Sequence, residues 1–294
     1  MKFVLVFLIL ALSSTIKAEE KIFNLMGTYA IIDLSEEEKA YESYRYLKEI
    51  ENKLSDYLED SEISQINKMA GIKPVNVSPL TFEVIEKALQ ICNQTKGAFD
   101  ITVGSITINY KRKKIIPLEK AKKLVNCKDL ILDKKNQTVF LKKKYMAIDL
   151  GGIGKGFAVE KVYEYIKQKE GFISIAGDMK VWGQKRKIAV YNPINKSILM
   201  EAVNKKDVCV STSGNYFQEH IIGKSTDLIQ VTVFYDECSF TDATSTGIFA
   251  MDKKFRENFL KDADFGYLII YKNGKVEFNK KIFDFLEEMR FYPF

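Results

Sequence analysis

The chain has 294 residues, of which 46% are hydrophobic and 29% are charged, which is ordinary for a globular protein with a hydrophobic core. This length suggests one large domain or two small ones. The formal net charge of +6 is too mild, and too evenly spread along the chain, to indicate a nucleic-acid-binding protein.

Residues 1–18 predict a secretory signal peptide. A basic residue, Lys2, precedes an apolar run from Phe3 to Leu12, and small residues lead to Ala18. The run is too short to span a bilayer, although a retained amino-terminal anchor is the alternative. No cysteine lies directly after the run, so we expect no lipid anchor. We expect the rest of the chain, residues 19–294, to be one domain.

The first elements of this domain are a strand and an amphipathic helix. Residues 24–34 read as one strand with Gly27 near its start. A helix from about Glu36 to Leu54 follows, with Ser35 as its cap and Glu38 completing a capping box. Helical spacing places four apolar side chains on one face of it: Ala40, Tyr44, Leu47 and Ile50.

A polar loop and a second helix come next. Ile63 and Ile66 are the apolar anchors of the loop. The helix begins after Ser78, which is its cap, and stops at Gly97. The basic run Lys111–Lys114 is expected in a loop, as a solvated surface segment.

The second half of the chain is rich in short strands. We expect paired strands at 130–133 and 138–143, followed by a helix that ends near Lys169. Short strands follow between 171 and 236, with turns at Gly177, Gly183, Asn192-Pro193, Gly214 and Gly223. The last expected elements are a helix over 239–252, a hairpin over 266–279 with Asn273-Gly274 as its turn, and a short final helix. This order is an α+β pattern rather than a strict βαβ alternation.

Four cysteines are present, and no two of them have the spacing of a metal site. They are Cys92, Cys127, Cys209 and Cys238. In an exported protein they could form disulfides in any of three pairings, and the sequence does not choose among these. The alternative is four small buried hydrophobic residues.

The segment Gly151–Gly156 holds four glycines and Lys155 immediately before a helical pattern. It fails the dinucleotide fingerprint, because the third glycine position is occupied by Phe157, and the same residue breaks the Walker pattern. A glycine-rich turn at a helix start still offers free N–H groups and a positive dipole end to an anion. The alternative is a tight turn that lets a helix and a strand pack closely.

Asp242 and Thr246 are four residues apart, and on a helix they share one face. A carboxylate, a hydroxyl and a backbone carbonyl together are a ligand set suited to Mg²⁺, whose other ligands are commonly phosphate oxygens. The alternative for Asp242 is helix capping, because Ser239 to Asp242 is itself a capping pattern.

His220 is the only histidine of the chain. Histidine is the usual proton acceptor near neutral pH, which makes His220 a candidate general base. The alternative is a structural histidine.

Taken in order, several stretches resemble the ApbE family, the FAD:protein FMN transferases. The matching stretches are MGTYA at Met26, SEISQIN at Ser61, GAFDITVG at Gly97, IDLGGIGKGFAVEK at Ile148, IAGDMKVWG at Ile175, VSTSGNY at Val210, HII at His220 and TDATSTGIFAMD at Thr241. The resemblance implies an ApbE-like, T-fold-like arrangement of mixed, largely antiparallel sheets flanked by helices.

The resemblance also implies an activity and a set of site residues. Such enzymes cleave FAD, attach FMN through a phosphoester to a threonine or serine of an exported redox-complex subunit carrying a short acceptor motif, and release AMP. By similarity, Mg²⁺ would be bound by Asp242, Thr246 and a main-chain oxygen near Gly152, and His220 would take the acceptor proton. The residues in stretches that resemble the FAD-lining ones are Met26, Tyr57, Ser61, Asp100, Lys155, Gly177, Asp178, Ser213 and Gly214.

The chain departs from the family pattern after His220. The family commonly continues H-I-I-D-P-x-T-G, whereas this chain reads HIIGKSTD, in which Asp227 is a possible substitute; Ala176 also stands where glycine is frequent. Two alternatives therefore remain: an Mg²⁺-dependent FAD pyrophosphatase that releases FMN and AMP, and a non-catalytic periplasmic FAD-binding protein. In all three cases we expect a soluble periplasmic protein.

Overall fold

The computed structural model describes residues 20–215 and 221–293. The predicted signal peptide, residues 1–18, and the candidate base His220 therefore lie outside the described residues. Among the described residues, no helix combines the length and the apolar character that a membrane span requires.

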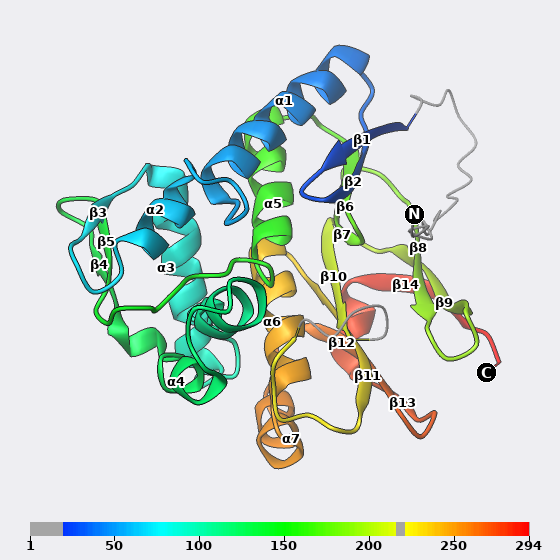
Figure 1. The fold of residues 1–294 in the computed structure, drawn as a ribbon. Coiled ribbons are helices and arrows are strands. Elements are labelled where there is room, and N and C mark those ends of the chain that lie inside the picture. The colour runs from blue at the N-terminus through cyan, green and yellow to red at the C-terminus, as the bar shows by residue number, and fades with distance from the viewer. Residues whose placement is uncertain (1–19, 216–220, 294) are drawn as a thin grey trace, which may run out of the picture.

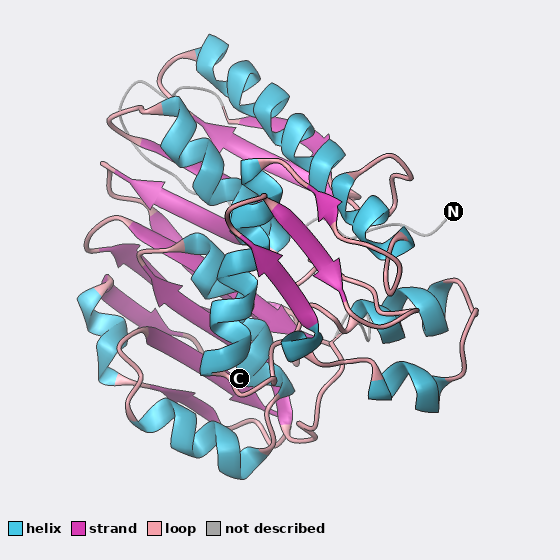
Figure 2. Ribbon diagram, turned by 90° about the vertical axis from the view of Figure 1, so that its left-hand side faces the viewer, coloured by secondary structure: helices cyan, strands magenta, loops and turns pink. Residues whose placement is uncertain are grey.

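An antiparallel sheet of eight strands is the centre of the fold, with the order β1-β2-β6-β7-β10-β11-β12-β13. Helices cover one face of it, and a three-stranded sheet covers the other (Figure 1, Figure 2). The strands of the large sheet are β1 Lys21–Leu25, β2 Thr28–Asp33, β6 Gly171–Ile175, β7 Asp178–Trp182, β10 Val208–Gly214, β11 Leu228–Tyr235, β12 Gly266–Tyr271 and β13 Val276–Phe278. The predicted α+β class with largely antiparallel sheets is confirmed.

Two smaller sheets complete the strand content. The covering sheet has the order β14-β9-β8 and the other has the order β3-β5-β4. Their strands are β8 Lys187–Asn192, β9 Ser197–Asn204, β14 Leu286–Phe291, β3 Val75–Asn76, β4 Leu130–Asp133 and β5 Thr138–Leu141. The predicted pairing of the strands at 130–133 and 138–143 is confirmed, while β14 was not expected.

Four of the described α-helices, α1, α3, α5 and α6, have 13 residues or more, and the others are shorter. The helices are α1 Glu37–Leu54, α2 Glu62–Lys68, α3 Pro79–Gln94, α4 Leu118–Lys123, α5 Gly154–Ile166, α6 Cys238–Ala250 and α7 Lys253–Lys261, with a π-helix at Ser105–Arg112 and 3₁₀ turns at Cys127–Asp129 and Lys280–Asp284. In Figure 1, α1, α5 and α6 form the layer directly against the large sheet, which places the glycine-rich turn at the start of α5 next to α6.

Several local predictions were wrong. Residues 24–34 form a hairpin rather than one strand, because Met26 and Gly27 both have positive φ, 49° and 69°, and make a two-residue loop. Ser35 does not cap α1, whose N-cap is Glu36 without a side-chain bond. The expected polar loop contains helix α2, and the basic run begins on the π-helix. Gly214, which was expected in a turn, is the last residue of β10.

Both disulfides form within the described residues. Cys92 bonds to Cys127, and Cys209 bonds to Cys238. The second bond joins the start of β10 to the first residue of α6. The alternative of four reduced, buried cysteines is therefore wrong for this structure.

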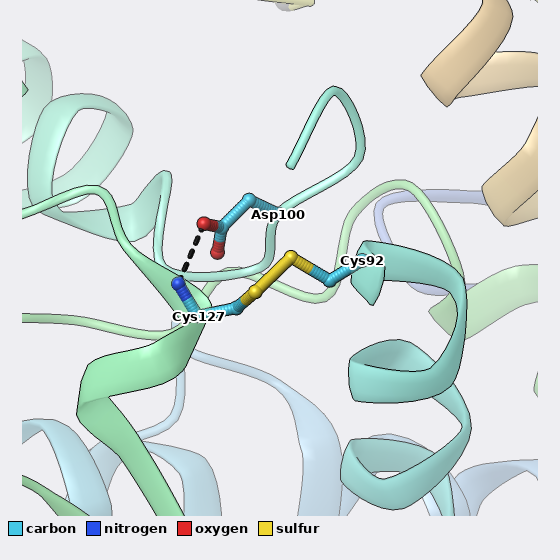
Figure 3. Close-up of side chains that lie close together, drawn as sticks. All are labelled: Cys92, Asp100 and Cys127. Atoms are coloured by element: carbon cyan, nitrogen blue, oxygen red, sulfur yellow. Dashed lines mark hydrogen bonds between the residues drawn. A yellow bond between two sulfur atoms is a disulfide. The ribbon is translucent and has the colours of Figure 1, made fainter. Parts of the chain in front are cut away.

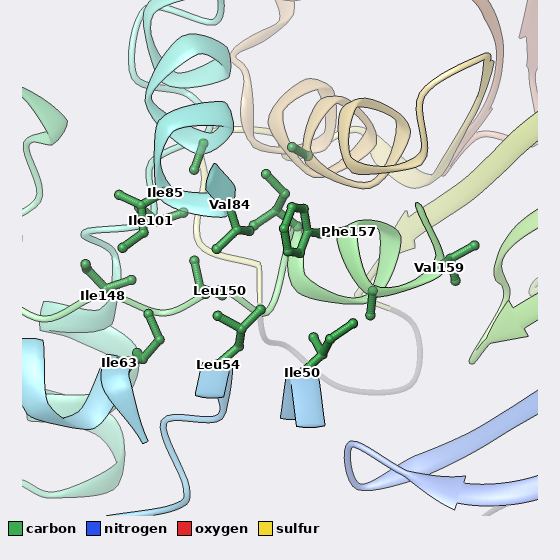
Figure 4. Close-up of a cluster of buried hydrophobic side chains, with 14 of the residues drawn as sticks. Ile50, Leu54, Ile63, Val84, Ile85, Ile101, Ile148, Leu150, Phe157 and Val159 are labelled. Carbon is green, nitrogen blue, oxygen red and sulfur yellow. The ribbon is translucent and has the colours of Figure 1, made fainter. Parts of the chain in front are cut away.

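Apolar side chains on both sides of the glycine-rich turn fix it to the core. Leu150 before the turn and Phe157 after it belong to a cluster with Leu54 of α1 and Val84 of α3 (Figure 4). Phe157 is fully buried. The turn is therefore held at both ends by hydrophobic packing, and its glycines lie where the chain passes α6.

Candidate active site

The glycine-rich turn and helix α6 meet at Gly156 and Asp242. The amide N–H of Gly156 donates to Oδ2 of Asp242, with an N···O distance of 2.9 Å. A Cβ on Gly156 would lie 2.3 Å from the carbonyl oxygen of Cys238 and 2.7 Å from Cβ of Asp242. Only glycine allows this close approach. The hydrogen bond shows that the two predicted halves of the site, 86 residues apart in the sequence, are adjacent in space.

The other two predicted metal ligands also lie together. A Cβ built on Gly152 would be 3.0 Å from Cγ2 and 3.1 Å from Oγ1 of Thr246, so the main chain of Gly152 runs directly beside that hydroxyl. Oγ of Ser213, on β10, is 3.0 Å from Oγ1 of Thr246. The structure thus brings Gly152, Asp242 and Thr246 to one place and adds Ser213 next to them.

Lys155 lies between two carboxylates of this site. Its Nζ is 2.7 Å from Oδ2 of Asp178 and 3.8 Å from Oδ2 of Asp242. Burial raises the pKa of Asp242 to about 7, the charge of Asp178 acts in the same direction, and Lys155 acts against both. Burial works against the charge of Lys155, but the two carboxylates outweigh it and hold the pKa of Lys155 above its usual value.

These residues fit a divalent cation. The nearby ligands are oxygen atoms of a carboxylate and of hydroxyls, which suit Mg²⁺. With all three groups ionised, Asp178, Lys155 and Asp242 carry one more negative charge than positive. Burial raises the pKa of Asp242 most, and the charge of Asp178 adds to the rise. Asp242 would hold the cation, with Thr246 and the main chain of Gly152 as its neighbours.

The roles expected for the helix start need revision. The amide of Gly156 is not free for an anion, because Asp242 already accepts its hydrogen bond. Capping of α6 by Asp242 is also wrong, since the N-cap of that helix is Glu237. Asp242 instead binds the first turn of the neighbouring helix α5, where the positive end of the helix dipole favours a carboxylate.

The hairpin between β6 and β7 positions Asp178. Ala176 and Gly177, with φ of 51° and 98°, form its two-residue loop, and Ile175 pairs with Asp178. Primed turns of this kind match the twist of the strands. Alanine in place of the family's glycine therefore keeps the hairpin, and Asp178 stands at a fixed position beside Lys155.

The segment after His220 is tied to the rest of the fold. The side-chain amide of Asn215 and the backbone of Ile221 share two hydrogen bonds of 3.0 Å each. Asp227 pairs with the buried Arg256 of α7, with an Oδ2 to Nη2 distance of 2.6 Å. The carboxylate proposed as a substitute for the missing family aspartate is therefore bound to an arginine.

Three further predicted FAD-lining residues, Met26, Ser61 and Tyr57, contact other parts of the protein. Met26 occupies the β1–β2 loop, where its N–H donates to Oε1 of Glu51 at 2.7 Å. Ser61 caps α2 by accepting from the N–H of Ser64 at 3.0 Å. Tyr57 is 78% exposed and carries the guanidinium of Arg112 at 4.0 Å from its ring centroid.

Asp100 lies beside the disulfide Cys92–Cys127 (Figure 3). It accepts the N–H groups of Thr102 and Cys127, both at 2.8 Å. Burial raises the pKa of Asp100, while these hydrogen bonds act against the rise. Both sulfurs are in the disulfide, so this group of residues is a structural link rather than a metal site.

Two residues that shape the site were missed by the sequence reasoning. Asp149 accepts the N–H of Gly151 at 2.8 Å and the hydroxyl of Thr107 at 2.6 Å, which holds the start of the turn. An aspartate two residues before a glycine is a common turn signal and could have indicated this role. Glu160 accepts from the N–H and the hydroxyl of Ser239, which locks α5 to α6, and no local pattern indicates it.

A sequence model of the ApbE family matches residues 26–269. The chain belongs to the ApbE family. The FAD:protein FMN transferase of Vibrio cholerae is 27% identical over 244 residues, which cover 71% of this chain and 72% of that protein. The one from Haemophilus influenzae is also 27% identical, over 86% of this chain and 85% of that protein.

Solved structures of this family share the fold. The flavin transferase ApbE from Vibrio cholerae superposes with a TM-score of 0.79 at 22% identity, over 91% of this chain and 99% of that one. The ApbE protein from Thermotoga maritima superposes with a TM-score of 0.83 at 24% identity, over 92% and 99%. At these identities the likeness establishes the ApbE architecture.

Proposed function

We propose that the chain is a FAD:protein FMN transferase. Family membership and the names of the related proteins support a flavin transferase. The single observation that carries the proposal is the contact between Asp242 of α6 and the glycine-rich turn at the start of α5. It brings a carboxylate close to the ammonium of Lys155 at the start of α5, and these are groups that would bind a divalent cation and a pyrophosphate.

In the proposed reaction a hydroxyl of the acceptor protein attacks the phosphorus on the riboflavin side of FAD. A new P–O bond forms to that hydroxyl oxygen, the pyrophosphate P–O bond breaks, and AMP leaves. Mg²⁺ held by Asp242, Thr246 and the main chain of Gly152 would neutralise charge on the pyrophosphate oxygens. Lys155 contributes a second positive charge, and His220 accepts the proton of the hydroxyl.

The acceptor class follows from the same proposal. It is a threonine or serine in a short motif of an exported redox-complex subunit. Residues 1–18 are then the signal peptide that takes this chain to the periplasm, where it meets the acceptor. Amino-terminal sequencing of the secreted protein tests this, and an intact residue 1 in the mature protein contradicts it.

The direct test is flavin transfer. The purified mature protein is mixed with FAD, Mg²⁺ and a candidate acceptor, and the acceptor becomes fluorescent on a denaturing gel. Asp242→Ala abolishes the transfer and leaves the folded state intact by circular dichroism. The proposal fails if no acceptor is labelled while a known flavin transferase labels the same acceptor in parallel.

The altered sequence after His220 makes hydrolysis of FAD the competing activity. Asp227, in that segment, is engaged by Arg256. Chromatography of FAD incubated without acceptor separates the two activities, because a pyrophosphatase releases FMN and AMP rapidly and a transferase does not. Intact FAD with no need for metal in either assay indicates a binding protein.

A further inference from the structure

Lys155 is shared by two buried carboxylates that come from different parts of the fold. Asp178 begins β7 and Asp242 lies on α6, and their side chains are 5% and 4% exposed. The ammonium is closer to Asp178, at 2.7 Å, than to Asp242, at 3.8 Å. The single positive charge of Lys155 is therefore shared by two carboxylates, and one of them, Asp242, is expected to bind the cation.

We infer that Lys155 is a resident counter-ion of the cation site and that Asp178 is the positioning residue that holds its ammonium aside. In the metal-free protein Lys155 partly neutralises Asp242. When a divalent cation binds Asp242, it repels the ammonium of Lys155, and Asp178 then holds that ammonium away from the cation. This inference rests on the proposed function, because it takes the divalent-cation site as its starting point.

The backbone on both sides of this cluster is held in place, which keeps both carboxylates close to the ammonium of Lys155. Gly156, next to Lys155, has its N–H bound to Asp242. Asp178 closes the tight β6–β7 hairpin through its pairing with Ile175. Because Asp178 and Asp242 both lie close to Lys155, a change of charge at one of these three groups affects the other two.

The inference predicts effects of opposite sign for two substitutions. Lys155→Met removes a positive charge close to the cation and therefore tightens its binding. Asp178→Asn removes a negative charge and leaves Lys155 to pair with Asp242 alone, which weakens cation binding. Even with the dielectric constant of water between them, a unit charge and a divalent ion about 5 Å apart interact strongly enough to change a dissociation constant more than about tenfold.

The experiment measures Mn²⁺ binding at pH 8 by the electron paramagnetic resonance signal of free Mn²⁺. The full mature chain is compared with Lys155→Met, Asp178→Asn and Asp242→Asn. Lys161→Met is the matched control, because this lysine lies on the same helix but pairs with Glu83, with its Nζ 2.8 Å from Oε1. We expect about tenfold tighter binding for Lys155→Met, about tenfold weaker binding for Asp178→Asn and a change of less than about threefold for Lys161→Met.

The outcomes separate this inference from the proposed function. If the wild-type chain and Asp242→Asn bind Mn²⁺ equally, the cation site itself is wrong. If Asp242→Asn abolishes binding but Lys155→Met equals the Lys161→Met control, the counter-ion role is overturned and the cation site stands. Should Lys155→Met fail to fold, Asp178→Asn decides alone, since unchanged or tighter binding in that variant contradicts the role given to Asp178.

Discussion

The carboxylate of Asp242 accepts the amide N–H of Gly156 at 2.9 Å, so a side chain of α6 satisfies the first turn of α5. The same carboxylate therefore has two roles: it stabilises the first turn of α5, and it is proposed to bind a cation. Gly156 has no room for a side chain because the carbonyl oxygen of Cys238 would be 2.3 Å from its Cβ.

Gly156→Ala is therefore expected to separate α5 from α6. The added methyl group overlaps the backbone of Cys238, and we expect the free energy of unfolding to fall by about 2 kcal/mol or more, as for other overpacked sites. Chemical denaturation measures the loss. Gly154→Ala is the matched control, because its Cβ would meet nothing closer than 3.7 Å, and it is expected to be neutral or stabilising by about 0.5–1 kcal/mol. Equal stability of the two variants would contradict the packing described for Gly156.

Cation binding is expected to depend on pH through Asp242, whose pKa burial raises to about 7. A proton and a metal ion compete for the same carboxylate, so the apparent dissociation constant of Mn²⁺ rises about tenfold for each pH unit below about 7 and is flat above it. Titrations between pH 5.5 and 8.5 check this. A constant affinity over that range would show that Asp242 is not the group that binds the ion.

The same raised pKa of Asp242 makes the metal-free protein less stable as the pH rises, whereas cation binding becomes stronger. The pKa of Asp242 is higher in the folded protein than in the unfolded chain. Its contribution to stability is therefore fully present at a pH below the pKa of the unfolded chain, and it is lost as the pH rises through about 7. Asp242→Asn removes the ionisation. The melting temperature of this variant, relative to wild type without divalent cations, should be higher at pH 8.5 than at pH 5.5. A difference that does not change with pH argues against a raised pKa.

The two disulfides are expected to contribute similarly to stability but differently to the site. They close loops with sequence separations of 35 and 29 residues, so removal of either as a double alanine variant should cost about 3–4 kcal/mol in the chain-entropy model. Loss of Cys209–Cys238 should also weaken Mn²⁺ binding, because this bond joins β10, which carries Ser213, to α6. Loss of Cys92–Cys127 should leave Mn²⁺ affinity unchanged. Equal effects on the cation would refute this division.

Tyr57 is expected to contribute to FAD binding through its ring. Tyr57 is 78% exposed, and the guanidinium of Arg112 lies over one face of its ring, so the other face offers an aromatic surface to a planar ligand. Tyr57→Ala should weaken FAD binding about tenfold or more, with only a small fall in melting temperature from the lost contact with Arg112, while Tyr57→Phe stays near wild type. Quenching of FAD fluorescence measures the affinity. Tyr41→Ala is the control, since Tyr41 is also exposed, at 43%, and lies on α1.

Much of the fold follows from local patterns. Helical spacing of apolar residues predicted α1, and Ala40, Leu47 and Ile50 are indeed buried on one face of it. The turn at Asn273-Gly274 predicted the hairpin of β12 and β13. The β1–β2 hairpin escaped notice because Met26, at positive φ, carries no turn signal of its own and only the partner strand shows where the chain reverses.

The sequence by itself determined the parts of the site: a glycine run before a helix, a carboxylate and a hydroxyl four residues apart, and membership of the ApbE family. Only the tertiary structure decided how they meet. The packing of α5 against α6 on the large sheet placed Asp242 on the amide of Gly156, put Lys155 between two carboxylates and chose one disulfide pairing of three. Local patterns reflect interactions between neighbours in the chain, whereas these contacts join residues that only the assembled sheet and its helix layer bring together.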